Sequence, residues 1–256
     1  MDYTRVLDKL DHLVETKDFD AARELLDYWI ADAVESRDKV GELNLYNESM
    51  GLYRKIGDKE KAMESAAKAL RLAESDAMAG MIITGTTFVN AATVYKAFGQ
   101  AADSIPLFEK AKALYETDLR EDDVRLGGLY NNMGLALLDL KRYDESLDSY
   151  RQALGVMEKV QYGKLESAIT YLNMADVYDA MRQEPEFEAL HSLDEWETIF
   201  EDLLDNAWDA IDDPELPRNG YYAFVAEKCA PVFGYYGRFM IKIVLEKRIA
   251  EILGQG

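Results

Sequence analysis

Apolar residues along this chain recur at steps of three and four positions, with polar residues between them. One such stripe consists of Tyr143, Leu147, Tyr150 and Leu154. This spacing places its members on one face of a helix. Turn-forming sequences interrupt the stripes at Gly57-Asp58 and Gly99-Gln100. The pattern predicts an all-α chain with helices near residues 2–15, 18–35, 38–56, 59–75, 79–98, 101–118, 122–140, 143–160, 164–182, 186–211, 218–232 and 235–253.

The stripes also repeat at a nearly fixed distance. Large aromatic residues at one helical position are 42, 42 and 41 residues apart, at Tyr46, Phe88, Tyr130 and Tyr171. Smaller residues follow four positions later and large ones seven positions later, in the rows Met50, Ala92, Gly134, Ala175 and Tyr53, Tyr95, Leu137, Tyr178. A small residue between two large ones lets a second helix approach closely. Because one helix pair cannot bury both of its faces, the pairs are expected to stack.

One repeat carries enough of this pattern to resemble a known family. Residues 129–154 contain, in order, Tyr130, Met133, Gly134, Leu137, Ser146, Tyr150 and Ala153. The segment resembles a tetratricopeptide repeat, and the 42-residue period is similar to the kinesin-light-chain type. The resemblance implies a right-handed α-solenoid of about six antiparallel helix pairs. It also implies a single domain over residues 1–256, with regular repeats in 1–182 and a divergent repeat and cap in 183–256.

The C-terminal part is rich in aromatic residues. A long acidic helix contains Trp196 and Trp208, and residues 221–236 hold six aromatic side chains around Pro231. Three interpretations are open: a cap over the last repeat, an aromatic binding pocket, or a homodimer interface. If the segment forms a dimer interface, a charged residue at Phe233 or Tyr235 should dissociate the dimer.

Composition and charge narrow the function. The 256 residues carry 29 Lys and Arg against 49 Asp and Glu, a formal net charge of −20. Such a surface repels nucleic acid and anionic membranes and favours a basic partner. The single cysteine fits a reducing compartment, and neither a secretory signal nor a membrane span is evident. We therefore expect a cytoplasmic protein that binds neither nucleic acid nor membrane.

No catalytic or metal-binding constellation is evident in the sequence. Phosphate-binding glycine motifs are absent, and the two histidines, His12 and His191, are far apart. Cys229 has Lys228 beside it but no histidine nearby, so a buried structural cysteine is expected. The sequence thus predicts no catalytic residues, no metal and no cofactor, and the protein is expected not to be an enzyme.

A row of asparagines follows the repeat. Asn90, Asn132 and Asn173 lie two residues after the large aromatic position, and Asn47 and Asn131 lie one residue after it. In the family that the chain resembles, first helices line a concave groove, so the resemblance implies amides along that groove. An asparagine side chain has one acceptor and two donors and can pair with the backbone of an extended peptide. The alternative is that each asparagine bonds a neighbouring helix and fixes the orientation of the repeats.

The resemblance also places charges of both signs in the groove. Arg54 and Lys96 make the early repeats basic, whereas Asp176 and Asp179 make the later ones acidic. We therefore expect an extended ligand of opposite polarity, with its basic part near Asp176.

Three functions are compatible with these features. The first is a non-catalytic adaptor or scaffold that binds an unidentified protein or extended peptide in the groove. The second is a structural module that homodimerises through its aromatic C-terminal cap. The third is an intracellular signalling-peptide receptor, since such receptors in bacteria are often built from these repeats.

Overall fold

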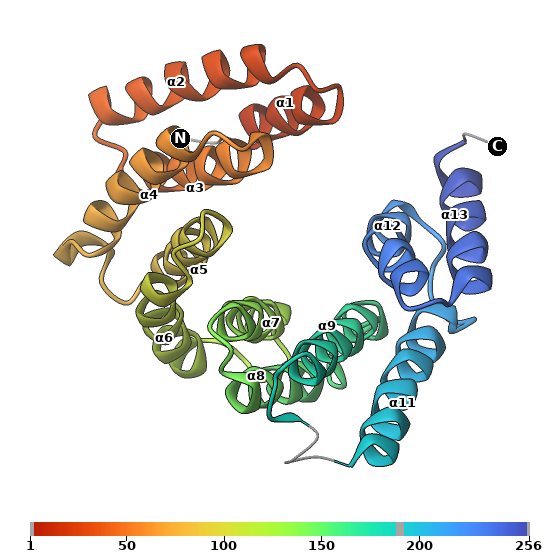
Figure 1. The fold of residues 1–256 in the computed structure, drawn as a ribbon. Coiled ribbons are helices and arrows are strands. Elements are labelled where there is room, and N and C mark those ends of the chain that lie inside the picture. The colour runs from red at the N-terminus through yellow and green to blue at the C-terminus, as the bar shows by residue number, and fades with distance from the viewer. Residues whose placement is uncertain (1–2, 188–191, 255–256) are drawn as a thin grey trace. The chain divides into compact units, whose positions relative to one another are not determined.

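The computed structural model describes residues 3–187 and 192–254 of the chain (Figure 1). The chain divides into two compact units, an N-terminal unit, Met1–Leu119, and a C-terminal unit, Arg120–Gly256. Within the described residues every regular element is helical, which confirms the predicted all-α fold class.

The helices of the N-terminal unit follow one another with short turns. They are α1 (Thr4–Glu15), α2 (Phe19–Glu35), α3 (Lys39–Ile56), α4 (Lys59–Ala73), the short 3-10 helix η1 (Asp76–Met78), α5 (Ile82–Ala97) and α6 (Ala101–Asp118). Pro106 lies inside α6, and the helix nevertheless begins at Ala101 as predicted.

The C-terminal unit contains six described helices. They are α7 (Val124–Asp139), α8 (Tyr143–Met157), α9 (Lys164–Arg182), α11 (Leu193–Asp212), α12 (Gly220–Tyr235) and α13 (Phe239–Leu253). The start of α11 and the end of α12 are among the boundaries that differ from those predicted. Helix α11 begins at Leu193, where the Ser192 side chain accepts the Glu195 N–H at 3.5 Å, and the part of the predicted helix over residues 188–191 lies outside the described residues. Helix α12 continues through Pro231 to Tyr235, and Pro231 lies on its exposed side, where water can bond the released carbonyl.

A recurring turn joins the two helices of several pairs. A residue with a left-handed backbone conformation is followed directly by the residue that caps the next helix. In Gly57-Asp58, for example, φ of Gly57 is 76°. The Asp58 carboxylate accepts the Lys61 N–H at 3.1 Å, and Asp18 and Asp38 cap their helices in the same way. Some of the acidic residues of this chain therefore stabilise the N-termini of helices.

Close packing between paired helices depends on the small residues of the repeat. Gly134 on α7 lies against the ring of Tyr150 on α8, and a Cβ at Gly134 would lie 2.6 Å from two carbons of that ring. The Ser146 hydroxyl donates to the Gly134 carbonyl at 2.8 Å. The small residue predicted to permit close approach therefore does so in this repeat.

The aromatic C-terminal segment completes the core of its unit. Phe233, Tyr222 and Leu245 are fully buried, and Trp196 stacks on Phe200 with ring centroids 4.8 Å apart. The proposal that Phe233 forms a dimer interface is wrong, because its side chain is 0% exposed inside this core.

Candidate peptide-binding site

In the N-terminal unit, the asparagines join two first helices. The Asn47 Nδ2 group on α3 donates to the hydroxyl of Thr87 on α5 and to the Leu43 carbonyl, both at 3.0 Å. Its Oδ1 accepts from Asn90 Nδ2 at 2.9 Å. Asn47 therefore uses both of its donor hydrogens and its acceptor inside the protein, in the bonds that fix one repeat to the next.

The equivalent pair in the C-terminal unit is only partly formed. Asn131 on α7 donates to the Thr170 hydroxyl on α9 at 2.9 Å, as Asn47 does to Thr87. The Asn131 Oδ1 atom is buried without a hydrogen-bond partner, whereas its counterpart on Asn47 accepts from Asn90. Asn173, which corresponds to Asn90, is half-buried on α9. Asn131 thus links α7 to α9.

The remaining residues of the predicted groove lie in different surroundings. Asn132 donates to the Gly128 carbonyl of its own helix at 2.8 Å. Arg54 is exposed near the end of α3, and Lys96 is half-buried on α5. The predicted residues are therefore divided between the two compact units, and the acidic end of the set lines a pocket.

That pocket has a volume of about 530 Å³ and lies where α9, the α7–α8 turn and the end of α12 meet. Asp176 and Asp179 come from α9, Tyr235 is the last residue of α12, and Tyr236 directly follows that helix. The sequence pointed to the two aspartates, but it did not show that tyrosines some 60 residues later lie beside them. The aromatic composition of residues 221–236 was the only signal for the tyrosines.

Hydrogen bonds fix the inner wall of this pocket. The Tyr236 hydroxyl donates to Asp176 Oδ1 at 2.5 Å, and Gln183 donates to Asp179 Oδ2 at 3.0 Å. Burial raises the pKa of the Asp176 carboxyl above its usual value, and the negative charge of Asp179 raises it further, although the Tyr236 bond opposes both. Tyr235 lies edge-on to Tyr236 and is 73% exposed, so its ring faces the solvent side.

The outer rim of the pocket is internally paired. Glu184 accepts from the Tyr143 hydroxyl at 2.5 Å and forms an ion pair with Lys141 at 3.0 Å. The two Glu184 partners lower the pKa of its carboxyl. Burial, together with the hydrogen bond to Glu184 and the charge of that carboxylate, raises the pKa of Tyr143 to about 12. The rim charges therefore compensate each other, and Asp176 and Asp179 give the pocket its negative charge.

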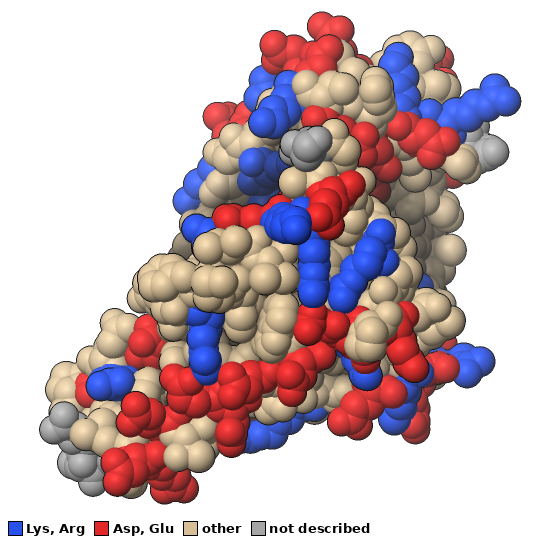
Figure 2. All heavy atoms as spheres, turned by 90° about the vertical axis from the view of Figure 1, so that its right-hand side faces the viewer, with Lys and Arg blue, Asp and Glu red and all other residues tan. Residues whose placement is uncertain are grey.

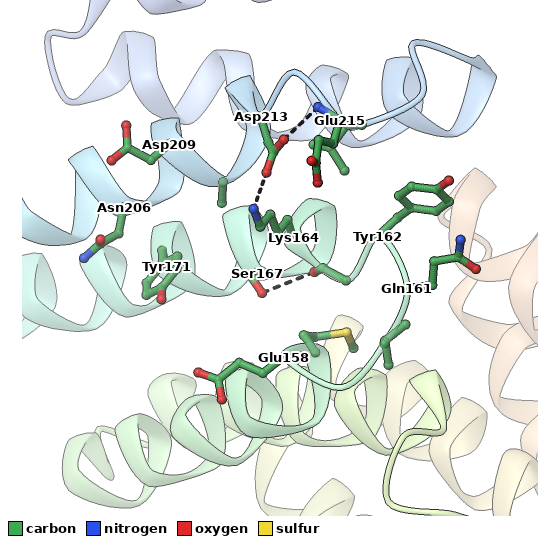
Figure 3. Close-up of a pocket in the computed structure, with 15 residues that line it drawn as sticks. Glu158, Gln161, Tyr162, Lys164, Ser167, Tyr171, Asn206, Asp209, Asp213 and Glu215 are labelled. Atoms are coloured by element: carbon green, nitrogen blue, oxygen red, sulfur yellow. Dashed lines mark hydrogen bonds and ion pairs between the residues drawn. The ribbon is translucent and has the colours of Figure 1, made fainter.

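A larger cavity of about 670 Å³ lies between the α8–α9 loop, α9 and the end of α11 (Figure 3). Its most buried carboxylate, Asp213, pairs with Lys164 and accepts the Glu215 N–H at 2.8 Å. Ser167 bonds the Gly163 carbonyl at 3.2 Å. The Asp213 charge is thus neutralised by Lys164, whereas Asp176 and Asp179 of the smaller pocket accept from the neutral side chains of Tyr236 and Gln183. The smaller pocket is therefore the better candidate for a positively charged ligand.

Replacing Asp176 by Asn should leave the C-terminal unit at least as stable at pH 7 as the wild type. The Asp176 pKa is raised in the folded protein, so this carboxyl favours folding most below its unfolded pKa and loses that contribution as the pH rises through the folded pKa. The amide keeps an acceptor for Tyr236 and removes the repulsion from Asp179.

Thermal unfolding of Asp176→Asn and wild type at pH 3.5 and pH 7 tests this prediction. The variant should gain stability relative to wild type as the pH increases. Asp148→Asn, the same change at an exposed position on α8, is the control and should show no such gain. A lower stability of Asp176→Asn at pH 7 would show that the ionised form is the stabilising one.

Other sequence-based predictions concern single residues. Cys229 is 1% exposed, and burial raises the pKa of its thiol to about 12, so it is a buried structural cysteine. His12 lies on α1, and His191 lies outside the described residues. Across residues 3–187 and 192–254, no three metal-binding side chains are arranged to hold an ion. None of the helices in those ranges is long and apolar enough to cross a membrane.

The helix pairs, their 42-residue period and the absence of strands from the described residues define an all-α helical-repeat solenoid. Tetratricopeptide-repeat family models match residues 51–76 and 125–190. The repeats in these two segments are therefore tetratricopeptide repeats. No curated protein matches the sequence.

Solved structures share the fold at low sequence identity. BtubC (BKLC) from P. vanneervenii is 21% identical, with a TM-score of 0.61 over 76% of this chain and 78% of that one. A putative kinesin light chain with TPR-like repeats from Podosopora anserina is 14% identical, with a TM-score of 0.56 over 83% and 95%. A Rap protein complexed with Competence and Sporulation Factor is 12% identical, with a TM-score of 0.53 over 96% and 73%.

Proposed function

We propose that this protein is a non-catalytic adaptor that binds an extended protein segment and holds one of its basic side chains in the pocket between α9 and α12. The observation that carries the proposal is the meeting of Asp176, Asp179 and the exposed Tyr235 ring in a pocket of about 530 Å³. An arginine or lysine side chain can place its charge between the two carboxylates and its stem against the ring.

Charge and fold support this assignment. A chain with a net charge of −20 attracts basic segments over long range. The fold relative complexed with Competence and Sporulation Factor shows a scaffold of this kind with a bound partner. Asn173 lies one turn before Asp176 on α9, and we propose that its amide pairs with the backbone of the bound segment.

Asn90, Asn131 and Asn47 have a smaller part in this proposal. Their amides join helices, so we propose that they hold the repeats in position and that the contacts with ligand come from α9 and α12. Arg54 and Lys96 lie in the other compact unit and are not part of the proposed pocket.

Selection of phage-displayed random peptides on the full chain tests the function. The selected peptides should be enriched in arginine or lysine. With the best peptide as a fluorescent probe, Asp176→Asn combined with Asp179→Asn should weaken binding by about 100-fold or more, because each of the two charged hydrogen bonds contributes about 1.5–3 kcal/mol. Tyr235→Ala should weaken binding by roughly threefold to fivefold, as expected for an exposed cation–π contact.

Asp148→Asn provides the matched control, since it removes one negative charge from the same unit at an exposed position. It should leave the affinity within twofold of wild type. Selected peptides without basic residues, or equal affinity for wild type and the double variant, would contradict the proposed pocket.

A further inference from the structure

Helix α13 has two apolar faces, and only one of them is covered in the described structure. Its inner face includes the fully buried Leu245, and Ile241, Ile249 and Ile252 pack against the core of the unit. Arg248 holds this face in place, donating to the Tyr222 hydroxyl at 3.0 Å and pairing with Asp212. The inner face thus accounts for the attachment of α13 to its own unit.

The outer face carries a second apolar stripe. Phe239, Met240, Ile243 and Leu253 are 63%, 73%, 55% and 45% exposed, respectively. At about 200 Å² for a whole side chain, these fractions leave on the order of 450 Å² of apolar surface. Charged side chains of the same face enlarge this area toward the roughly 800 Å² that each partner contributes to a standard interface.

The charges on this face balance, unlike those of the chain as a whole. Lys242 lies 3.7 Å from Glu246, and Lys247 lies 3.8 Å from Glu251, so the four exposed groups sum to zero. Helix α11 shows the opposite pattern, with exposed acids at Asp194, Glu195, Glu197, Glu201, Asp202, Asp205 and Asp209. Figure 2, which views the right-hand side of Figure 1, shows Asp and Glu side chains gathered over the lower part of that face.

We propose that the outer face of α13 is the surface through which two copies of this chain associate. Two acidic surfaces of this protein repel each other, but two α13 faces can meet without net repulsion because their charges cancel. Each copy contributes the same apolar stripe, which is what a two-fold symmetric interface requires. Lys242 and Glu246, like Lys247 and Glu251, are neighbours on the helix surface. Each of these charges can therefore pair instead with an opposite charge on the second copy.

The association should become stronger with added salt. Outside the interface both copies are acidic, and salt screens that repulsion without weakening apolar contacts. A basic partner bound to the acidic surface would dissociate with added salt instead, so the sign of the salt effect separates the two kinds of complex.

Sedimentation velocity of the full chain over a concentration range up to about 200 μM tests the proposal. Wild type should dimerise, and its dissociation constant should decrease when the NaCl concentration is raised from about 50 to about 500 mM. Ile243→Glu should raise that constant at least 50-fold while leaving the circular dichroism spectrum unchanged. Met240→Glu is a second variant of the same kind, in case Ile243→Glu lowers stability.

Tyr28→Glu is the matched control, because Tyr28 is an exposed apolar residue of α2, 65% exposed. It should dimerise as the wild type does. A wild-type chain that stays monomeric throughout overturns the proposal, even if the α13 face captures some other protein. Wild-type affinity in both folded α13 variants, or a dimer that weakens with salt, overturns it as well.

Discussion

Phe233→Asp should unfold the C-terminal unit, whereas Tyr235→Asp should leave it folded. Both aromatics lie in the last two turns of α12, but Phe233 is 0% exposed and Tyr235 is 73% exposed. Truncating a buried phenylalanine costs about 3–5 kcal/mol. An aspartate adds the cost of burying an unpaired charge, so the total approaches the full stability of a typical domain.

Urea unfolding followed by circular dichroism measures this difference. Phe233→Asp should show the loss of the cooperative transition of the C-terminal unit, and Phe233→Leu should retain it with a lower midpoint. Tyr235→Asp should stay within about 0.5 kcal/mol of wild type, as is usual for surface positions. Comparable losses for Phe233→Asp and Tyr235→Asp would contradict the opposite orientations of the two rings.

The sequence could not show that Phe233 is buried and Tyr235 exposed. A predicted helix end near Pro231 leaves undetermined which face of a helix the following residues occupy. A proline inside a helix usually ends or kinks it, so a helix over residues 218–232 and a new one from 235 was the natural prediction. The helix instead continues to Tyr235 and turns at Gly237, where φ is 78°. With a continuous helix, Tyr222, Cys229 and Phe233 share the inner face, and Tyr235 points away from it.

The asparagine row shows a different limit of sequence reasoning. The repeat spacing correctly identified Asn47, Asn90 and Asn131 as equivalent or adjacent positions on first helices. Whether such an amide faces a ligand or the next helix depends on a hydrogen-bond partner about 40 residues away, and in this chain that partner is a threonine. Periodicity predicts which face a residue occupies, but it does not predict which side chain lies opposite.

The Asp176 pocket shows the same limit for long-range contacts. Its aspartates belong to a regular repeat and could be predicted, whereas Tyr235 and Tyr236 come from the divergent segment, which does not follow the period. The regular part of the fold is predictable because each repeat packs on its neighbour by the same rule. The pocket lies where the regular repeats meet the divergent segment, so the residues that line it could be identified only from the structure.

Gly134→Met should destabilise the C-terminal unit by about 3 kcal/mol or more, because the ring of Tyr150 already occupies the space of the new side chain. Tyr150 is completely buried and packed on all sides. Gly155→Met on α8 is the control, because a Cβ at Gly155 meets nothing within 4 Å. That change should be neutral or slightly stabilising, since it removes a glycine from a helix.

The repeats themselves indicate how to rescue the variant. At successive repeats, 42 residues apart, the paired positions are Met50 with Ala66, Ala92 with Phe108, and Gly134 with Tyr150, all of them buried. As the first-helix residue becomes smaller, the second-helix residue becomes larger, so the summed volume stays nearly constant, as close packing requires.

A double-mutant cycle tests this volume exchange by urea unfolding. Tyr150→Ala alone should cost about 3–5 kcal/mol through the cavity that it leaves. Gly134→Met combined with Tyr150→Ala recreates the Met50–Ala66 arrangement and should cost at least 2 kcal/mol less than the sum of the single changes. Simple additivity of the two changes would mean that the methionine cannot enter the space vacated by the tyrosine, and that each repeat has its own packing rather than a shared one with exchanged volumes.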